Sequence, residues 1–299
     1  MARPLRDGLS DPGSGAKSQI HTQTLRGNLH VLLGFGGNIT VSTGREGTLL
    51  IDDEYAGLTP KVRAALAELR SLPVKLVVNT HWHNDHTGGN EAFARGGALI
   101  IAQENAARRM RSDEILSLYG PQKAYPPIAW PAITFDKSLR LRWNGDEIDV
   151  IHVGPAHTDG DAIVFFHQQD VMATGDLFVG YNYRPPYFDD LNGGSAHGMI
   201  AAADTLLKLT DERTIVVPGH GDVTDRAELQ GYRDRLVAIR DRITGAMASA
   251  INCQRPLPIR TETEECALLS RLIGQSVPPT PSATCRKAVV HLLQRAYRA

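Results

Sequence analysis

A buried strand that runs directly into a cluster of histidines constrains this chain more than any other feature. The apolar run Val74–Asn79 is followed by Thr80-His81-Trp82-His83-Asn84-Asp85-His86. Residues at positions i and i+2 beyond a strand project to the same side, so His81 and His83 can bind one metal ion. Asp85 and His86 belong to the turn that follows and suit a second ion nearby. Imidazoles this close repel one another when protonated, which favours a metal centre over a surface cluster of histidines.

Three more candidate ligands follow other predicted strands. Each lies in a glycine-containing segment at a strand end: His157 in Gly154–Asp161, Asp176 in Ala173–Asp176, and His220 in Val216–Gly221. Taken alone, a glycine-flanked residue of this kind is as often a simple turn residue. In α/β sheets, however, ligands gather outside the ends of the strands. The joint occurrence therefore predicts that all these residues converge on one cleft.

The order of predicted elements is typical of a layered α/β architecture, because strands and helices alternate in two similar passes. Strands are expected at Leu29–Leu33, Ile39–Ser42, Thr48–Ile51, Val74–Asn79, Ser138–Leu141, Glu147–His152, Ala162–His167, Asp170–Ala173 and Thr214–Val217. Helices are expected at Pro60–Leu72, 104–116, Ala196–Leu207 and Arg226–Ile243. Between them, Ser117–Pro131 is expected to be a long irregular loop.

The two ends of the chain differ in composition from its centre. Residues 1–18 are rich in Gly, Ser, Asp and Pro and predict a flexible leader. One domain is expected over 19–250, and a helical C-terminal extension over 251–299 is expected to pack on it, with helices at about 264–273 and Thr284–Tyr297. The cysteines, Cys253, Cys266 and Cys285, are expected to be idle thiols, with one bridge as the alternative.

Composition excludes several classes of protein. The chain has 299 residues, 42% of them hydrophobic, and a formal net charge of −1, which is ordinary for a globular protein and gives no electrostatic footprint for nucleic acid. No apolar run approaches the ~20 residues that span a bilayer. The first residues lack the apolar segment of a secretory signal, which favours a cytoplasmic protein, with earlier removal of a signal as the alternative.

These motifs, in this order, resemble those of the metallo-β-lactamase superfamily. The resemblance covers residues from about 28 to 245 and rests on Ile51-Asp52, the His81–His86 block, His157, Asp176 and His220. It implies a four-layer αβ/βα sandwich, an α/β fold, with the domain at 19–250 as the catalytic domain.

The resemblance also implies a role for each candidate residue. Asp52 would orient ligands through hydrogen bonds, with a strand-end cap as the alternative. Histidine at 86 with aspartate at 176 is similar to glyoxalase II, whereas typical dizinc β-lactamases have cysteine in place of this aspartate. The nitrogen and oxygen donors suit two Zn²⁺ ions, and Mn²⁺ or Fe²⁺ are permitted. The first ion would take His81, His83 and His157, the second Asp85, His86 and His220, and Asp176 would bridge both.

The expected activity is hydrolysis of a small acyl compound: a β-lactam, lactone, ester or thioester. Metal-bound hydroxide, available near neutral pH, would attack the acyl carbon, and Asp85 would orient it and pass its proton to the leaving group. The alternatives are a phosphodiesterase or sulfate-ester hydrolase, an iron dioxygenase, a diiron partner of a flavoprotein, and a structural metal protein. A small-molecule substrate is expected, with no nucleic-acid or membrane partner; the oligomeric state stays open.

Signals for the substrate itself are weak. Cysteine-type β-lactamases have a lysine at the position of Val179, which argues against β-lactams. Arg184 or Asn192 are candidates to replace that lysine, and solvated loop residues are the alternative. Candidates for an oxyanion donor or an apolar wall of the cleft are Trp82, Tyr181 and Tyr183, with ordinary packing as the alternative. His197 is a further candidate near the cleft.

Overall fold

Two β-sheets form the centre of the structure, a computed structural model that describes residues 18–180 and 186–252. The chain divides into two compact units, Met1–Arg233 and Asp234–Ala299, and both sheets belong to the first. The predicted leader lies outside the described residues, apart from Ser18. The two helices predicted in the C-terminal extension and all three cysteines also lie outside them. Of the extension, the structure describes only residues 251 and 252, which end a helix. The predicted domain boundary at residue 250 therefore stays a prediction.

The first sheet has seven strands in the order β1-β2-β3-β4-β5-β6-β9. The strands β1 to β4 pair antiparallel, and β4, β5, β6 and β9 pair in parallel. Their bounds are β1 His21–Arg26, β2 Leu29–Leu33, β3 Ile39–Ser42, β4 Thr48–Ile51, β5 Val74–Val78, β6 Leu99–Gln103 and β9 Ile133–Phe135.

The second sheet has five strands in the order β10-β11-β12-β13-β14. Asn144 and Gly145 both have positive φ, 53° and 80°, as a tight hairpin turn between β10 and β11 requires. The last pair, β13 and β14, is parallel. The bounds are β10 Ser138–Trp143, β11 Asp146–His152, β12 Ala162–Phe166, β13 Val171–Ala173 and β14 Ile215–Val217.

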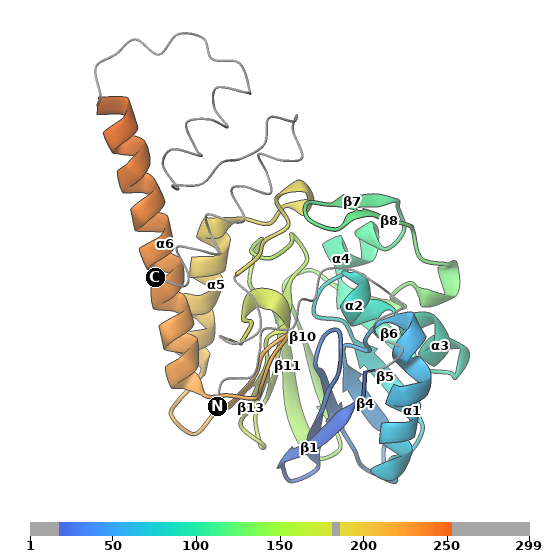
Figure 1. The fold of residues 1–299 in the computed structure, drawn as a ribbon. Helices are drawn as coiled ribbons and strands as arrows, with labels where there is room; N and C mark the ends of the chain where they lie inside the picture. The colour runs from blue at the N-terminus through green and yellow to red at the C-terminus, as the bar shows by residue number, and fades with distance from the viewer. Residues whose placement is uncertain (1–17, 181–185, 253–299) are drawn as a thin grey trace. The chain divides into compact units, whose positions relative to one another are not determined.

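The two sheets face each other across one apolar core (Figure 1). In β10 the side chains alternate strictly, so that the arginines point away while Leu139, Leu141 and Trp143 pack on this core. Sixteen buried residues form it: Leu29, Val31, Leu49, Ile51, Leu76, Val78, Ile101, Phe135, Ile148, Val150, Ala162, Val164, Phe166, Val171, Ala173 and Val217.

Helices cover the outer faces of the sheets. Helix α1, which has Pro60 in its first turn, buries Val62, Ala65 and Leu66 against the first sheet, and Phe93 of α3 joins them. Helix α5 lies on the side of the second sheet that is away from the first sheet (Figure 1). The predicted four-layer α/β sandwich is therefore confirmed. The bounds are α1 Thr59–Glu68, α2 Asn84–Thr87, α3 Asn90–Arg95, α4 Glu104–Arg109, α5 Ala196–Leu209 and α6 Arg226–Asn252.

No helix in the described ranges combines the length and apolar composition needed to cross a bilayer.

The prediction of one helix over 104–116 is wrong in its second half. Helix α4 ends at Arg109, and Glu114–Leu116 forms strand β7, which pairs with β8, Gly120–Gln122, inside the predicted irregular loop. The side chain of Asp113 accepts hydrogen bonds from Lys123 Nζ at 2.6 Å and from Ala124 N at 2.9 Å. These cross-strand contacts outweigh the local preference for helix.

Three strands of the first sheet were not predicted. The strand β1 is mostly exposed, so its sequence lacks a hydrophobic pattern, and β9 has only three residues. The strand β6 carries a continuous apolar run that periodicity alone does not distinguish from a helix.

Ile148 tests the core between the sheets, because its side chain is fully buried there. Ile148→Ala should lower the free energy of unfolding by about 2–5 kcal/mol through lost burial and a cavity. Arg142→Ala, on the opposite face with an 84% exposed side chain, should change it by no more than about 0.5 kcal/mol. Urea denaturation of the two variants measures both values, and equal losses would contradict this description of the core.

Candidate metal centre

The candidate ligands lie beyond the ends of four strands, at one edge of the two sheets. His81 and His83 follow β5, His157 follows β11, Asp176 follows β13 and His220 follows β14.

The short helix α2 separates the ligands of the histidine block. His83 is the residue before this helix and keeps an extended backbone, and the amides of His86 and Thr87 donate to its carbonyl at 3.0 and 3.1 Å. Thr87 Oγ1 donates to the same carbonyl at 2.9 Å. The reversal of the chain at α2 therefore turns Asp85 and His86 away from His83.

The first cluster consists of His81, His83 and His157. Their ligand atoms all lie within 4.8 Å of one another, and all three residues are buried. His157 Nε2 is 3.1 Å from His83 Nδ1, so two ring nitrogens face each other directly.

The second cluster consists of Asp85, His86 and His220. Asp85 Oδ2 lies 3.3 Å from His220 Nε2 and 3.9 Å from His86 Nε2. Asp85 has the more accessible carboxylate, with 13% of its side chain exposed against 2% for Asp176.

Asp176 lies between the two clusters. Its Oδ1 is 3.1 Å from His86 Nε2 and 3.2 Å from His220 Nε2, while its Oδ2 is 3.6 Å from His157 Nε2. One carboxylate thus reaches histidines of both clusters with different oxygens, as a shared ligand would.

The residues fit divalent metal ions. His81 Nε2 is buried and has no hydrogen-bond partner within the described part of the chain. Burial, together with the neighbouring His86 and other imidazoles, holds the pKa of His81 well below its ordinary value, so this ring is neutral at neutral pH. A neutral, orphaned nitrogen inside a set of nitrogen and oxygen donors is what a Zn²⁺ site requires.

The second cluster has the opposite electrostatic character. Burial opposes a charge on His86, but Asp176, Asp85 and Asp52 outweigh burial and raise the pKa of His86 well above its ordinary value. Burial alone would likewise raise the pKa of Asp85, whereas His86 and His220 lower it well below the ordinary range. These carboxylates supply the negative charge that a cation would need.

Two imidazoles are held by residues of the first sheet. Asp52, predicted to orient ligands, accepts hydrogen bonds from His86 Nδ1 at 2.8 Å and from Thr80 Oγ1 at 2.7 Å. Thr80 Oγ1 in turn lies 3.1 Å from His81 Nδ1. Asp52 has a left-handed backbone, with φ of 63°, a conformation that costs energy in residues other than glycine. In both rings the Nε2 atom is left facing the cluster.

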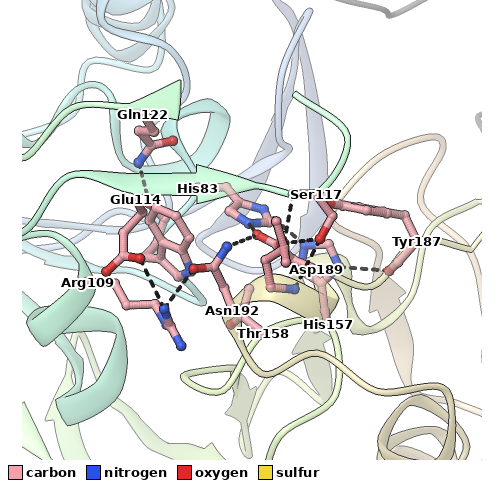
Figure 2. Close-up of polar contacts among 12 residues, drawn as sticks. His83, Arg109, Glu114, Ser117, Gln122, His157, Thr158, Tyr187, Asp189 and Asn192 are labelled. Atoms are coloured by element: carbon pink, nitrogen blue, oxygen red, sulfur yellow. Dashed lines mark hydrogen bonds and ion pairs between the residues drawn. The ribbon is translucent and has the colours of Figure 1, made fainter. Parts of the chain in front are cut away.

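Two further imidazoles are held by residues that the sequence analysis missed (Figure 2). Asp189 Oδ2 lies 3.2 Å from His83 Nε2, and the carbonyl of Tyr187 accepts from His157 Nδ1 at 2.9 Å. Burial would raise the pKa of Asp189, but hydrogen bonds from His83 and Ser117 outweigh it and lower the pKa to about 2. No motif marks these two residues, so the sequence carries no signal for them.

Most of the substrate candidates that the structure describes have buried side chains. Trp82 is fully buried in a small core with Ala102, Ala106, Met110 and Leu116, so it forms no cleft wall. Asn192 is buried and hydrogen-bonded, so it is not the solvated loop residue that the sequence offered as an alternative. Val179 is buried and forms a bridge to His220, and His197 is exposed. Tyr181, Tyr183 and Arg184 lie outside the described residues.

A glycine-rich loop between β2 and β3 closes over the second cluster. Gly37 N donates to the Asp85 carbonyl at 2.9 Å, and a Cβ at Gly37 would overlap the His86 ring. The buried Glu54 carboxylate accepts from Gly36 N at 2.8 Å and from Tyr55 N at 3.1 Å. Burial raises the pKa of Glu54 to about 7, against the lowering effect of these two hydrogen bonds.

The raised pKa of Glu54 predicts a pH-dependent stability. The folded protein holds this proton up to about pH 7 and the unfolded chain only to about 4.5, so the contribution of Glu54 is lost as the pH rises between these values. Relative to Glu54→Gln, the metal-free wild type should lose roughly 2–3 kcal/mol of unfolding free energy from pH 5 to pH 8. Urea denaturation measures the difference, and parallel pH profiles would contradict it.

Known proteins share both the motifs and the fold. Residues 32–220, more than half of the chain, match the family model of the metallo-beta-lactamase superfamily. A solved metallo-beta-lactamase from Pontibacter korlensis superimposes with a TM-score of 0.59 at 21% identity, over 73% of this chain and 99% of that one.

Two curated relatives have names that state different reactions. The 2,4-dinitroanisole O-demethylase subunit alpha of a Nocardioides strain is 25% identical over 59% of this chain and 52% of its own length. The hydroxyacylglutathione hydrolase of a Polaromonas strain is 30% identical over 52% of this chain and 52% of its own length. The chain thus spans about half the length of either relative.

Proposed function

Because the chain belongs to the metallo-β-lactamase superfamily and is a metal-dependent hydrolase, we propose that it is a dinuclear zinc enzyme acting on a small acyl substrate. The observation that carries this proposal is the position of Asp176 between two clusters of histidines, with one oxygen toward each. The first ion would take His81, His83 and His157, the second Asp85, His86 and His220, and Asp176 would serve both. Mn²⁺ or Fe²⁺ would fit the same donors.

When bound, such ions supply a water activated for attack at neutral pH and polarise the bond that is attacked. The chain itself contributes the orientation of the ligands and a proton carrier. Asp85 suits this second task because its carboxylate is the more exposed of the two in the site, and its Oδ2 is the oxygen that lies nearest the histidines His86 and His220. Its other oxygen can accept a proton from the nucleophile and return it to the leaving group.

The acyl class of substrate is supported by the chemistry of the site and by one relative. Asp176 stands where cysteine-type β-lactamases have a metal-binding cysteine, and Val179 stands where they have a lysine for the carboxylate of the drug. The Polaromonas relative is named as a hydrolase of hydroxyacylglutathione, a thioester. Thioesters, esters and lactones are therefore favoured over β-lactams.

The shared ligand provides the first test. Asp176→Asn should bind less metal than the wild type, because an amide cannot supply the charge that two cations need, and kcat/KM should fall at least about 100-fold. Asp136→Asn changes an exposed carboxylate after β9 and should leave both unchanged. Elemental analysis and hydrolysis assays measure the two effects. Full activity and metal content in Asp176→Asn would overturn the dinuclear site.

A substrate panel provides the second test. A thioester, a lactone, nitrocefin and bis-p-nitrophenyl phosphate are offered to the protein before and after treatment with a chelator. We expect turnover of the thioester or lactone, its loss on chelation, its return with Zn²⁺, and about two Zn per chain. Turnover of the phosphodiester alone, or one Fe per chain with oxygen consumption, would overturn the proposal in favour of a phosphodiesterase or a dioxygenase.

A further inference from the structure

Asp189 is a buried carboxylate that no motif of the sequence includes. It lies two residues after Tyr187 and directly before a short 3₁₀ helix, Asp190–Asn192. Its side chain is fully buried, and its Oδ2 lies 3.2 Å from Nε2 of His83. This nitrogen is on the far side of the ring from Nδ1, the atom that faces His157 Nε2 at 3.1 Å (Figure 2).

The contact determines which nitrogen of His83 carries the proton. An ionised carboxylate only accepts hydrogen bonds, so Nε2 of His83 must be the donor. The neutral ring then has its lone pair on Nδ1, directed at the first cluster. A carboxylate behind the ring also makes the ring more basic and therefore a stronger ligand.

Further hydrogen bonds hold Asp189 in place. Its Oδ1 accepts from the amide of Ser117 at 3.0 Å and from Ser117 Oγ at 2.6 Å. Its Oδ2 accepts from Asn192 Nδ2 at 2.6 Å. Its own amide donates to the carbonyl of His157 at 2.7 Å, so the same residue contacts two ligands of the first cluster.

The residues around Asp189 are themselves held by charged groups. Asn192 accepts from Arg109 Nη1 at 2.7 Å and donates to the carbonyl of Ile115 at 2.9 Å. Arg109 makes a two-pronged ion pair with Asp159, with both distances 2.7 Å. A bidentate guanidinium–carboxylate pair is geometrically rigid, so it fixes Arg109 of α4. Through Arg109 and through Ile115 of β7, Asn192 is held in place behind the metal centre.

We propose that Asp189 is the positioning residue of the first cluster: it fixes the tautomer and orientation of His83 so that Nδ1 binds the first metal ion. The inference rests on the proposed function only in requiring that this cluster binds a metal. Asp189 would act on His83 as Asp52 acts on His86, through the ring nitrogen that faces away from the cluster.

The test measures metal binding as well as activity. Asp189→Asn has nearly the same shape, but its amide cannot hold His83 with a charge. We expect Zn²⁺ to bind about 10–100-fold more weakly in competition with a chromogenic chelator, and the visible spectrum of the Co²⁺-loaded protein to change. Asn192→Ala keeps the carboxylate and removes one of its donors, so its loss should be smaller. Asp136→Asn, which changes an exposed carboxylate after β9, should match the wild type.

The outcomes separate this inference from the proposed function. Wild-type zinc affinity and an unchanged Co²⁺ spectrum in both Asp189→Asn and Asn192→Ala would overturn it, whatever happens to the stability of the metal-free protein. If Asp189→Asn does not fold, the graded loss in Asn192→Ala decides. A wild type that binds two metal ions but hydrolyses no acyl substrate would overturn the proposed function, while weaker binding in Asp189→Asn would still support the role of Asp189.

Discussion

The structure depends on bringing five imidazoles and two carboxylates together at one edge of the sheets, away from water. Nearly all of these side chains are buried, and several pairs of their nitrogen and oxygen atoms lie only 3.1 to 3.9 Å apart. Polar atoms in a medium of low dielectric are costly unless they are paired or bind a cation. The two clusters meet this cost differently. The imidazole of His81 in the first cluster is neutral, and the imidazole of His86 in the second is paired with carboxylates.

Holding such a site requires hydrogen-bond partners from segments far apart in the chain. Asp52 and Thr80, which follow strands of the first sheet, hold His86 and His81 from behind, and Asp189 and Tyr187, from the segment before α5, hold His83 and His157. Each of these contacts occupies one ring nitrogen and leaves the other for the centre of the site. The left-handed backbone of Asp52 is a local cost that this arrangement imposes.

Sequence patterns predicted those parts of the fold whose physics is local. The strands with clear apolar patterns and the amphipathic helix after β4 were found within a few residues of their ends. Residues 110–122 were not, because the β7–β8 hairpin is stabilised by contacts such as Asp113 with Lys123 that periodicity does not record. For Trp82 the sequence left a cleft wall and ordinary packing open, and the structure shows ordinary packing, because a residue between two ligands can still face a separate small core.

By itself, the sequence determined the candidate ligands, because histidines and aspartates at strand ends can be read from local spacing and residue type. It also determined the layered α/β fold, since the order of apolar strands and helices follows from burial. Only the tertiary structure decided which nitrogen of each histidine faces the centre. That choice depends on hydrogen bonds between residues far apart in the chain, as between His83 and Asp189. A carboxylate more than a hundred positions away acquires its role only when the chain is folded.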